Sequence, residues 1–251
     1  MLTYLRKIRK SFIDSGSVRK YLVYAIGEIG LVVIGILIAL QFNTWNENQK
    51  TRNIEQEYLL ALKEEFEYNK NELKRVIDLN EKFTDGAMKI SDYTGPQIPE
   101  ITEEVFEDLA INSFGSEVHY NPNEGVLDEL INSGKLGIFS NSELKFALSS
   151  WSGDLKRAQW IEKTHETLRI QIVEMTRVYG NIRKMTFPWG KQYNIKQTKF
   201  KRGNLHLLKS EEYDNRVVAF ILTARTLNNT YANLGEKIER ILLLIDDEIK
   251  F

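Results

Sequence analysis

The residue types best suited to catalytic or metal chemistry are three histidines, and their spacing supports neither role. His119, His165 and His206 form no HExxH or HxH pattern, so the sequence predicts no metal site. His165 falls on the apolar stripe of a predicted helix, where we expect a hydrogen-bonded core histidine. Cysteine is absent, which excludes a thiolate nucleophile, cysteine-ligated zinc and disulfide bonds.

The arrangement of the acidic residues does not indicate an enzyme either, and the common catalytic and nucleotide-binding motifs are absent. The most prominent carboxylates occur as pairs of neighbours in sequence, which point to different parts of a helix surface. We expect these pairs to lie on solvated helix faces and not to act as an acid/base pair. They are Glu64–Glu65, Glu103–Glu104 and Asp246–Asp247. The sequence contains no GxSxG, Walker A or GxGxxG motif. We therefore expect a protein that is not an enzyme and that uses no cofactor.

One carboxylate stands out because it lies inside an apolar stretch. Residues 21–42 read YLVYAIGEIGLVVIGILIALQF, and as a helix they would span roughly 33 Å, about the thickness of a bilayer's hydrocarbon core. Glu28 lies about a third of the way along it. A carboxylate there could pair with a partner helix or carry ions or protons. The alternative is a residue near the membrane interface, either protonated or reaching for headgroups.

Small residues in the same stretch would let a second helix approach closely. They are Gly27, Gly30, Gly35 and Ala39. We expect the lipid bilayer as one partner, and a second protein or a second copy of the chain as another.

Basic residues are concentrated before the apolar stretch, and few follow it. Residues 1–20 contain Arg6, Lys7, Arg9, Lys10, Arg19 and Lys20, whereas residues 43–62 contain Lys50 and Arg52. The positive-inside rule then places residues 1–20 in the cytoplasm and residues 43–251 in the periplasm of a bacterial inner membrane. The first segment is either a short helix lying on the membrane surface or a frayed basic tail.

A second basic region lies between residues 175 and 210, where no Asp or Glu occurs. Aromatic residues are interleaved with its cations, as expected for a segment that contacts anionic headgroups of the outer leaflet. A solvated loop that offsets nearby acidic helices is the alternative. The expected periplasmic location argues against nucleic acid. The residues expected to contact the anionic surface are Arg183, Lys184, Lys191, Lys196, Lys199, Lys201 and Arg202.

The elements that must position these groups are long helices. Apolar residues recur in steps of mostly three and four over residues 47–83, 141–179 and 211–250, a pattern typical of helices with coiled-coil-like packing. The similar lengths predict an elongated antiparallel bundle. Residues 84–140, which are broken by glycine and proline, would form a small distal helical cap. In this bundle the first long helix runs away from the membrane, the second returns toward it and the last runs outward again. The connection at 180–210 would then face the membrane.

Local signals place several helix ends. Thr102, Ser140 and Ser210 are each followed by acidic residues in a position to form a first turn, so we expect them to be N-caps. Gly134 is expected to follow the end of another helix.

Two stretches carry a resemblance to a known family. Residues 19–47 read RKYLVYAIGEIGLVVIGILIALQFNTWNE, and residues 125–151 read GVLDELINSGKLGIFSNSELKFALSSW. The first resembles the anchor, and the second the internal motif, of a family of uncharacterised single-pass membrane proteins common in Bacteroidota. The resemblance implies a membrane-anchored domain of unknown function and supplies no catalytic residues.

Together these observations predict a mainly α-helical chain with one transmembrane helix and a periplasmic helical domain. The expected function is a non-enzymatic module for binding, sensing or assembly of a membrane complex. The alternative is an ion- or proton-coupled subunit of a larger membrane machine that uses Glu28. A degenerate enzyme or sensor pocket in the 84–140 region is a third hypothesis, although no small-molecule ligand is predicted.

Overall fold

The computed structural model describes residues 18–97 and 100–249, and these form helices and turns with no β-strand among them. The mainly α class predicted from the sequence is therefore confirmed. The expected surface helix within residues 1–20 lies almost entirely outside the described residues. The helices in chain order are α2 Val18–Ser91, α3 Glu103–Phe114, α4 Gly125–Asn132, η1 Lys135–Ile138, α5 Ser142–Tyr179, α6 Ile182–Met185, α7 Phe187–Gly190, η2 Lys191–Tyr193, η3 Leu205–Lys209 and α8 Glu211–Glu248.

The chain divides into two compact units, Met1–Gln56 and Glu57–Phe251, which we call unit one and unit two. In unit one, the described residues belong to α2. Among the described helices, α2 alone is long and apolar enough to cross a membrane, and none of its most apolar window is buried. The long apolar N-terminal helix predicted from the sequence is thus confirmed.

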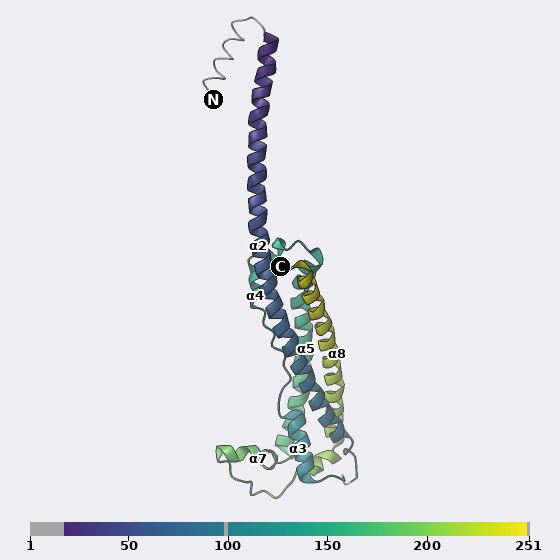
Figure 1. Ribbon diagram of the computed structural model, residues 1–251. Helices are drawn as coiled ribbons and strands as arrows, with labels where there is room; N and C mark the ends of the chain where they lie inside the picture. Colours follow the sequence, from purple (N-terminus) through teal and green to yellow (C-terminus); the bar gives the residue numbers. More distant parts are fainter. Residues whose placement is uncertain (1–17, 98–99, 250–251) are drawn as a thin grey trace. The chain divides into compact units, whose positions relative to one another are not determined.

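Unit two is built on α5, α8 and the second half of α2, which lie side by side (Figure 1). The helix α8 runs antiparallel to α2, as two ion pairs show. Lys63 Nζ lies 2.7 Å from Asp246 Oδ1, and Lys70 Nζ lies 2.8 Å from Glu239 Oε1. The residue number rises along α2 as it falls along α8, so the two helices are antiparallel. The predicted path, in which both helices run away from the membrane, is therefore wrong for α8.

The helix α5 runs parallel to α2, so the predicted direction of α5 is wrong as well. Glu143, at the start of α5, accepts a hydrogen bond from Arg240 Nε at 2.9 Å, and Ser150 accepts one from Lys237 at 2.7 Å. The helix α5 is therefore antiparallel to α8 and cannot also be antiparallel to α2. Consequently the connection at 180–210 lies at the Ser91 end of unit two.

The physical reason is the path of residues 116–140, which lead the chain back before α5 begins. Asn69 donates to the carbonyl of Asn123 at 2.7 Å and accepts from its amide at 2.6 Å. Glu65 accepts from the amides of Val126 and Leu127 at 2.7 and 3.1 Å. The 84–140 region is therefore not gathered into one cap: α3 lies at the end of unit two that holds the connection, and α4 lies at the other (Figure 1).

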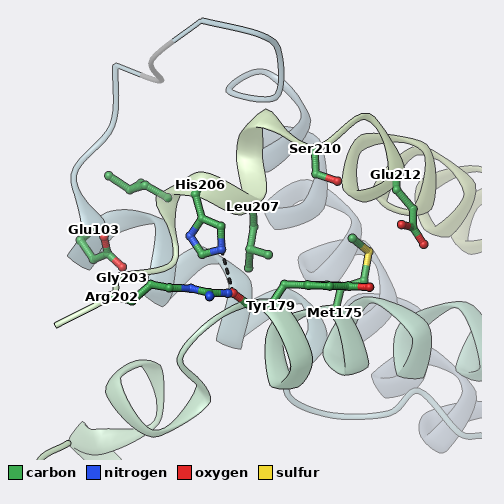
Figure 2. A pocket seen from close by; sticks show the side chains of 10 residues that line it. Glu103, Met175, Tyr179, Arg202, Gly203, His206, Leu207, Ser210 and Glu212 are labelled. Atoms are coloured by element: carbon green, nitrogen blue, oxygen red, sulfur yellow. Dashed lines mark hydrogen bonds between the residues drawn. The ribbon is translucent and has the colours of Figure 1, made fainter. Parts of the chain in front are cut away.

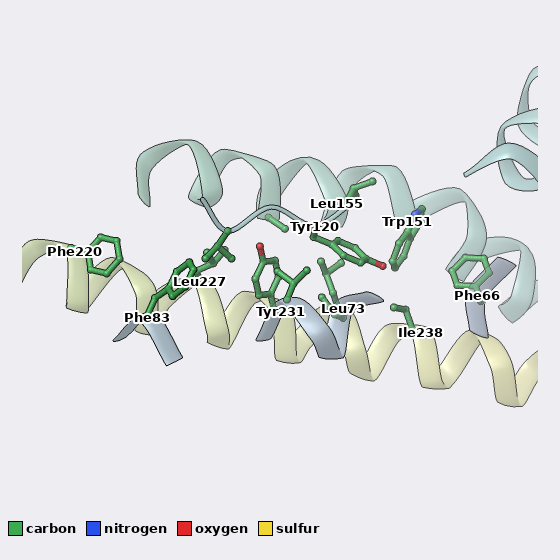
Figure 3. Packing of buried hydrophobic residues seen from close by; sticks show 14 of the residues in the cluster. Phe66, Leu73, Phe83, Tyr120, Trp151, Leu155, Phe220, Leu227, Tyr231 and Ile238 are labelled. Atoms are coloured by element: carbon green, nitrogen blue, oxygen red, sulfur yellow. The ribbon is translucent and has the colours of Figure 1, made fainter. Parts of the chain in front are cut away.

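The buried side chains of unit two form one apolar core in which aromatic rings meet edge to face (Figure 3). Phe66 and Trp151 are 5.3 Å apart between ring centroids, and Phe114 and Phe220 are 5.1 Å apart. The apolar seam predicted for the last helix is confirmed, since almost all of its predicted positions are buried: Val217, Ile221, Ala224, Leu227, Tyr231, Leu234, Ile238, Ile241 and Ile245.

Most of the predicted helix ends are confirmed, and one is shifted. Thr102 accepts from the amide of Val105, and Ser210 accepts from that of Tyr213. Gly134 follows α4 with a left-handed φ of 68°. The cap of α5 is Asn141 in place of the predicted Ser140, because the Asn141 side chain accepts from two amides of the first turn.

Candidate binding site

Residues 180–210, the connection between α5 and α8, form four short helical turns, α6, α7, η2 and η3, joined in part by irregular segments. Asn181 accepts from the amide of Lys184 at 3.1 Å and so starts α6. Pro188 lies in the first turn of α7, where its missing N–H needs no partner. Asn194 then ends the next turn with a left-handed φ of 58°. Local capping thus divides the segment into short helices.

Asn204 fixes the connection to the rest of unit two, and the sequence did not single it out. It is fully buried, and its side-chain oxygen accepts from the amide of Asn181 at 2.6 Å. Its amide N–H donates to Glu103, and its side-chain NH₂ donates to Glu107 at 2.7 Å. Two carboxylates of α3 therefore hold a segment about a hundred residues further along the chain.

The same contacts change the acidity of α3. Burial raises the pKa of the Glu107 carboxyl above its ordinary value, the Asn204 amide lowers it, and the neighbouring Glu103 raises it further. No local signal in the sequence identifies these groups, because Glu103 and Glu107 resemble ordinary solvated residues of a helix's first turns.

Most of the cations predicted to contact an anionic surface lack an acidic partner. Lys184 Nζ lies 3.6 Å from Glu103 Oε1. Arg183 uses its Nε to donate to the carbonyl of Lys196 at 2.8 Å. Within the described part of the chain, the following six form no ion pair, and all are exposed: Arg183, Lys191, Lys196, Lys199, Lys201 and Arg202.

Exposed aromatic rings accompany these cations. The Lys191 ammonium lies 5.1 Å from the centroid of the Phe187 ring. Tyr193 and Phe200 are 73% and 81% exposed, and Trp189 is 44% exposed. The connection therefore presents positive charge and apolar surface together, which suits an anionic surface with an apolar layer beneath it.

A pocket of about 800 Å³ lies where the connection meets the end of α5 and the start of α8 (Figure 2). Its wall includes Met175 and Tyr179 of α5 together with Arg202 of the connection. His206 also lines it, with Nε2 at 2.8 Å from the carbonyl of Tyr179 (Figure 2). That bond holds the imidazole against backbone, so the geometry is that of a structural contact.

Of the other histidines, His165 lies in the core as predicted, but without the expected hydrogen bonds. It is 2% exposed and its ring is stacked on Phe220 at 4.2 Å between centroids. Neither ring nitrogen has a hydrogen-bond partner among the described residues. Burial, assisted by the positive charge of Arg169, lowers the pKa of His165 to about 4. Within the described chain, no group of three or more acidic or histidine side chains is placed to hold a metal ion.

The residues expected to pack against another helix lie on the apolar part of α2. A Cβ added at Gly27, Gly30 or Gly35 would meet no atom within 4 Å, and Ala39 is exposed. Glu28 is partly exposed and forms no hydrogen bond or ion pair within the described residues. The structure thus leaves this stretch open to contact.

The fold and the site together define a mainly helical protein with one long apolar helix and a basic, pocketed end on its second unit. The model of a family of unknown function, DUF6090, matches residues 28–155, half of the chain, and the chain belongs to this family. The match begins at Glu28 and contains the whole second motif, residues 125–151. No curated protein and no solved structure shows significant similarity to the chain.

Proposed function

We propose that this protein is a non-enzymatic helical module, anchored in a bacterial inner membrane by residues 21–42, that binds, senses or assembles partners through unit two. The observation that carries the proposal is the exposure of the apolar part of α2. Each large aliphatic side chain removed from water contributes about 1.5–3 kcal/mol, so a run of them is stable only if lipid or protein covers it. The exposed members of the run include Leu31, Val32, Ile34, Ile36, Leu37, Ile38 and Leu40.

The distribution of basic residues supports the proposed orientation. Six arginines and lysines precede residue 21, and two follow within residues 43–62. The N-terminus is then cytoplasmic and unit two is periplasmic. The resemblance of residues 19–47 to a Bacteroidota membrane anchor supports the same assignment.

The proposed contact of unit two is an anionic surface that binds the connection. Six exposed and unpaired cations support it. Because α5 runs parallel to α2, the earlier reason for expecting contact with the anchoring leaflet no longer applies. The proposal therefore rests on the charge and the aromatic residues of the connection.

The anchor is tested with charged substitutions in the full-length chain. We expect Ile34→Arg combined with Leu37→Arg to move the protein from the membrane fraction to the soluble or aggregated fraction, because arginine at the centre of a span is strongly disfavoured. The matched control is Leu60→Arg, which changes a leucine of α2 that is 52% exposed in unit two. Equal membrane retention of all three proteins would contradict the anchor.

Orientation needs a separate measurement. Alkaline phosphatase fused after the last residue should be active, and a fluorescent protein that fails to mature in the periplasm should stay dark. The opposite pair of results would place unit two in the cytoplasm.

An ion- or proton-coupled subunit remains the second candidate, and Glu28 is the observation that favours it. This carboxylate has no hydrogen bond or ion pair within the described residues and lies in an apolar run, where a partner helix or a proton would stabilise it. Glu28→Gln should abolish coupled ion movement in the native complex while leaving membrane retention unchanged. Full activity of that variant would reject a coupling role.

A further inference from the structure

We propose that a second pocket of unit two binds a long-chain fatty acid, with the hydrocarbon chain among apolar walls and the carboxylate at Arg169. The pocket has a volume of about 740 Å³, within the range of small-molecule sites in proteins. It lies between α2, α3, α5 and the short helices of the connection. The inference does not depend on whether residues 21–42 cross a membrane.

The walls of the pocket are apolar and are fixed by the core. Phe83 of α2, Phe114 of α3 and Ile172 of α5 line it, and they are 6%, 3% and 1% exposed. Met185 and Trp189 of the connection complete the wall. Because three of these side chains also pack in the core, the pocket is already formed without a ligand.

The charge of the pocket is of one sign. Its lining contains Lys82, Arg169 and Arg177, and no carboxylate. Arg177 pairs with Glu174 one turn earlier on α5, and Lys82 is exposed without an ion pair in the described chain. An apolar cavity bordered by cations is complementary to a hydrocarbon chain that carries one anionic group.

Arg169 is the group best placed to bind that anion. Its Nη1 donates to the carbonyl of Phe114 at 3.0 Å, which orients the guanidinium. Its Nε is buried and has no hydrogen-bond partner among the described residues. Because Arg169 lines the pocket, a carboxylate bound there would accept from the accessible part of its charged guanidinium and would offset the charge of a group whose Nε is unsatisfied.

The remaining polar groups of the lining favour a lipid over a sugar or a nucleotide. The hydroxyl of Thr176 donates to the carbonyl of Ile172 at 3.3 Å, and that of Thr186 donates to Ile182 at 2.8 Å. Both hydroxyls are thus engaged within their own turns, which leaves Asn112 and Ser116, both exposed to solvent, as the other neutral polar side chains of the lining. A ligand with many hydrogen-bonding groups would find few free partners, whereas a hydrocarbon chain needs none.

Trp189 provides a direct measurement of occupancy. The full-length protein is held in amphipol, in a Trp45→Phe background that removes the tryptophan beside the apolar helix, and is titrated with dibrominated stearate. We expect saturable quenching that Trp189→Phe abolishes. The matched control Trp160→Phe, which removes a 68% exposed indole outside the pocket, should retain it. Absence of saturable quenching, or quenching that survives Trp189→Phe, would overturn the proposal.

The charge of the head group is tested separately. Arg169→Gln should weaken binding about tenfold or more, the usual effect of losing a charged hydrogen bond. Since Arg169 also supports Phe114, Lys82→Gln serves as a second variant that touches no packed group, and it should weaken binding by about threefold. Arg157→Gln, an exposed α5 residue outside the pocket, should have no effect.

The methyl ester of dibrominated stearate completes the design, because it keeps the chain and removes the charge. It should bind at least about tenfold more weakly than the acid. Equal binding of ester and acid, or equal weakening by Arg157→Gln and Lys82→Gln, would reject the assignment of an anionic head group. Membrane retention of every variant, measured in parallel, keeps this outcome distinct from failure of the anchor.

Discussion

The two ends of unit two use their polar side chains in opposite ways. At the α4 end, Glu65 and Asn69 are buried, and each bonds the backbone of the segment that leads into α4. At the other end, the connection exposes six cations without ion pairs and borders two pockets. The difference indicates that the first end determines the path of the chain, while the second leaves charge and cavities available for contact.

The centre of the bundle, like the α4 end, uses buried polar side chains to hold parts of the chain together. Glu162, which is 4% exposed, accepts from the hydroxyl of Tyr231 at 2.7 Å and from the amide of Tyr120 at 3.2 Å. His119 Nδ1 lies 2.8 Å from its other oxygen. Burial, followed by the charge of Glu162, raises the pKa of the Tyr231 hydroxyl, so this group stays a hydrogen-bond donor. A buried polar network of this kind favours one arrangement of the three long helices.

The largest difference between the regions should appear on removal of a tryptophan. Trp151→Ala removes a fully buried side chain that packs on Phe66, and should lower the free energy of unfolding by about 3–5 kcal/mol. Trp189→Ala, in the connection, should lower it by less than about 1 kcal/mol because that ring is 44% exposed. Urea unfolding of the full-length protein in detergent, followed by far-UV circular dichroism, measures both. Equal losses would remove the contrast between core and connection.

A pH titration should reveal the burial of His165 in the core. The pKa of His165 is lowered to about 4 in the folded state and is about 6.5 when unfolded, so the unfolded state takes up the proton first. Above pH 6.5 the ring is neutral in both states and contributes no pH dependence. As the pH falls from 6.5 to 4, stability should fall by up to about 3 kcal/mol and then level off.

The control for this titration is His165→Phe. This variant keeps a ring against Phe220 and should remove that part of the pH dependence. If the slope between pH 6.5 and 4 is the same in His165→Phe as in the unchanged protein, another group is responsible.

The path of residues 116–140 is tested by Asn69→Ala. This change leaves the amide and carbonyl of Asn123 without their side-chain partners, and should lower stability by about 2 kcal/mol. Asn112→Ala is the matched substitution near the connection, where the side chain is exposed, and it should change stability by less than about 0.5 kcal/mol. A loss below about 0.5 kcal/mol for Asn69→Ala would mean that the return path is held by apolar packing instead.

Helical periodicity predicted the parts of the fold that depend on neighbours in sequence. The seam of α8 and the apolar run of α2 follow from spacing alone, because residues three and four apart share a helix face. Near α5 two capping residues are adjacent, and composition could not decide between them. Asn141 is the cap because its oxygen reaches two amides at once.

The directions of α5 and α8 relative to α2 depend on groups distant in sequence, which is why they were predicted wrongly. Glu65 lies 61 residues before Val126, whose amide it bonds. Asn204 and Glu107 are separated by 97 residues, and in sequence neither differs from a solvated residue. Similar helix lengths are compatible with several bundle topologies, so the parallel arrangement becomes evident only from contacts between residues distant in sequence. The basic connection, by contrast, was evident from composition, although the pockets beside it were not.

The smallest effect on stability, and the one most informative about binding, is expected from the connection itself. Replacing its four most clustered cations with glutamine should change the free energy of unfolding by less than about 0.5 kcal/mol, since none forms an ion pair within the described chain. Binding to anionic liposomes should nevertheless fall about tenfold or more and lose its salt dependence, because each basic residue near such a surface contributes about 1 kcal/mol. The four residues are Lys196, Lys199, Lys201 and Arg202.

The comparison requires the full-length protein in zwitterionic nanodiscs, mixed with liposomes that contain or lack phosphatidylglycerol. A control quartet of exposed residues on α2 and α5, changed to glutamine, alters the net charge equally: Lys74, Lys156, Arg157 and Lys163. If the control quartet weakens liposome binding as much as the connection quartet, net charge alone explains the interaction. If only the connection quartet weakens it, the local density of unpaired cations and exposed rings at this end of unit two is the cause, because charge number is the same in both variants.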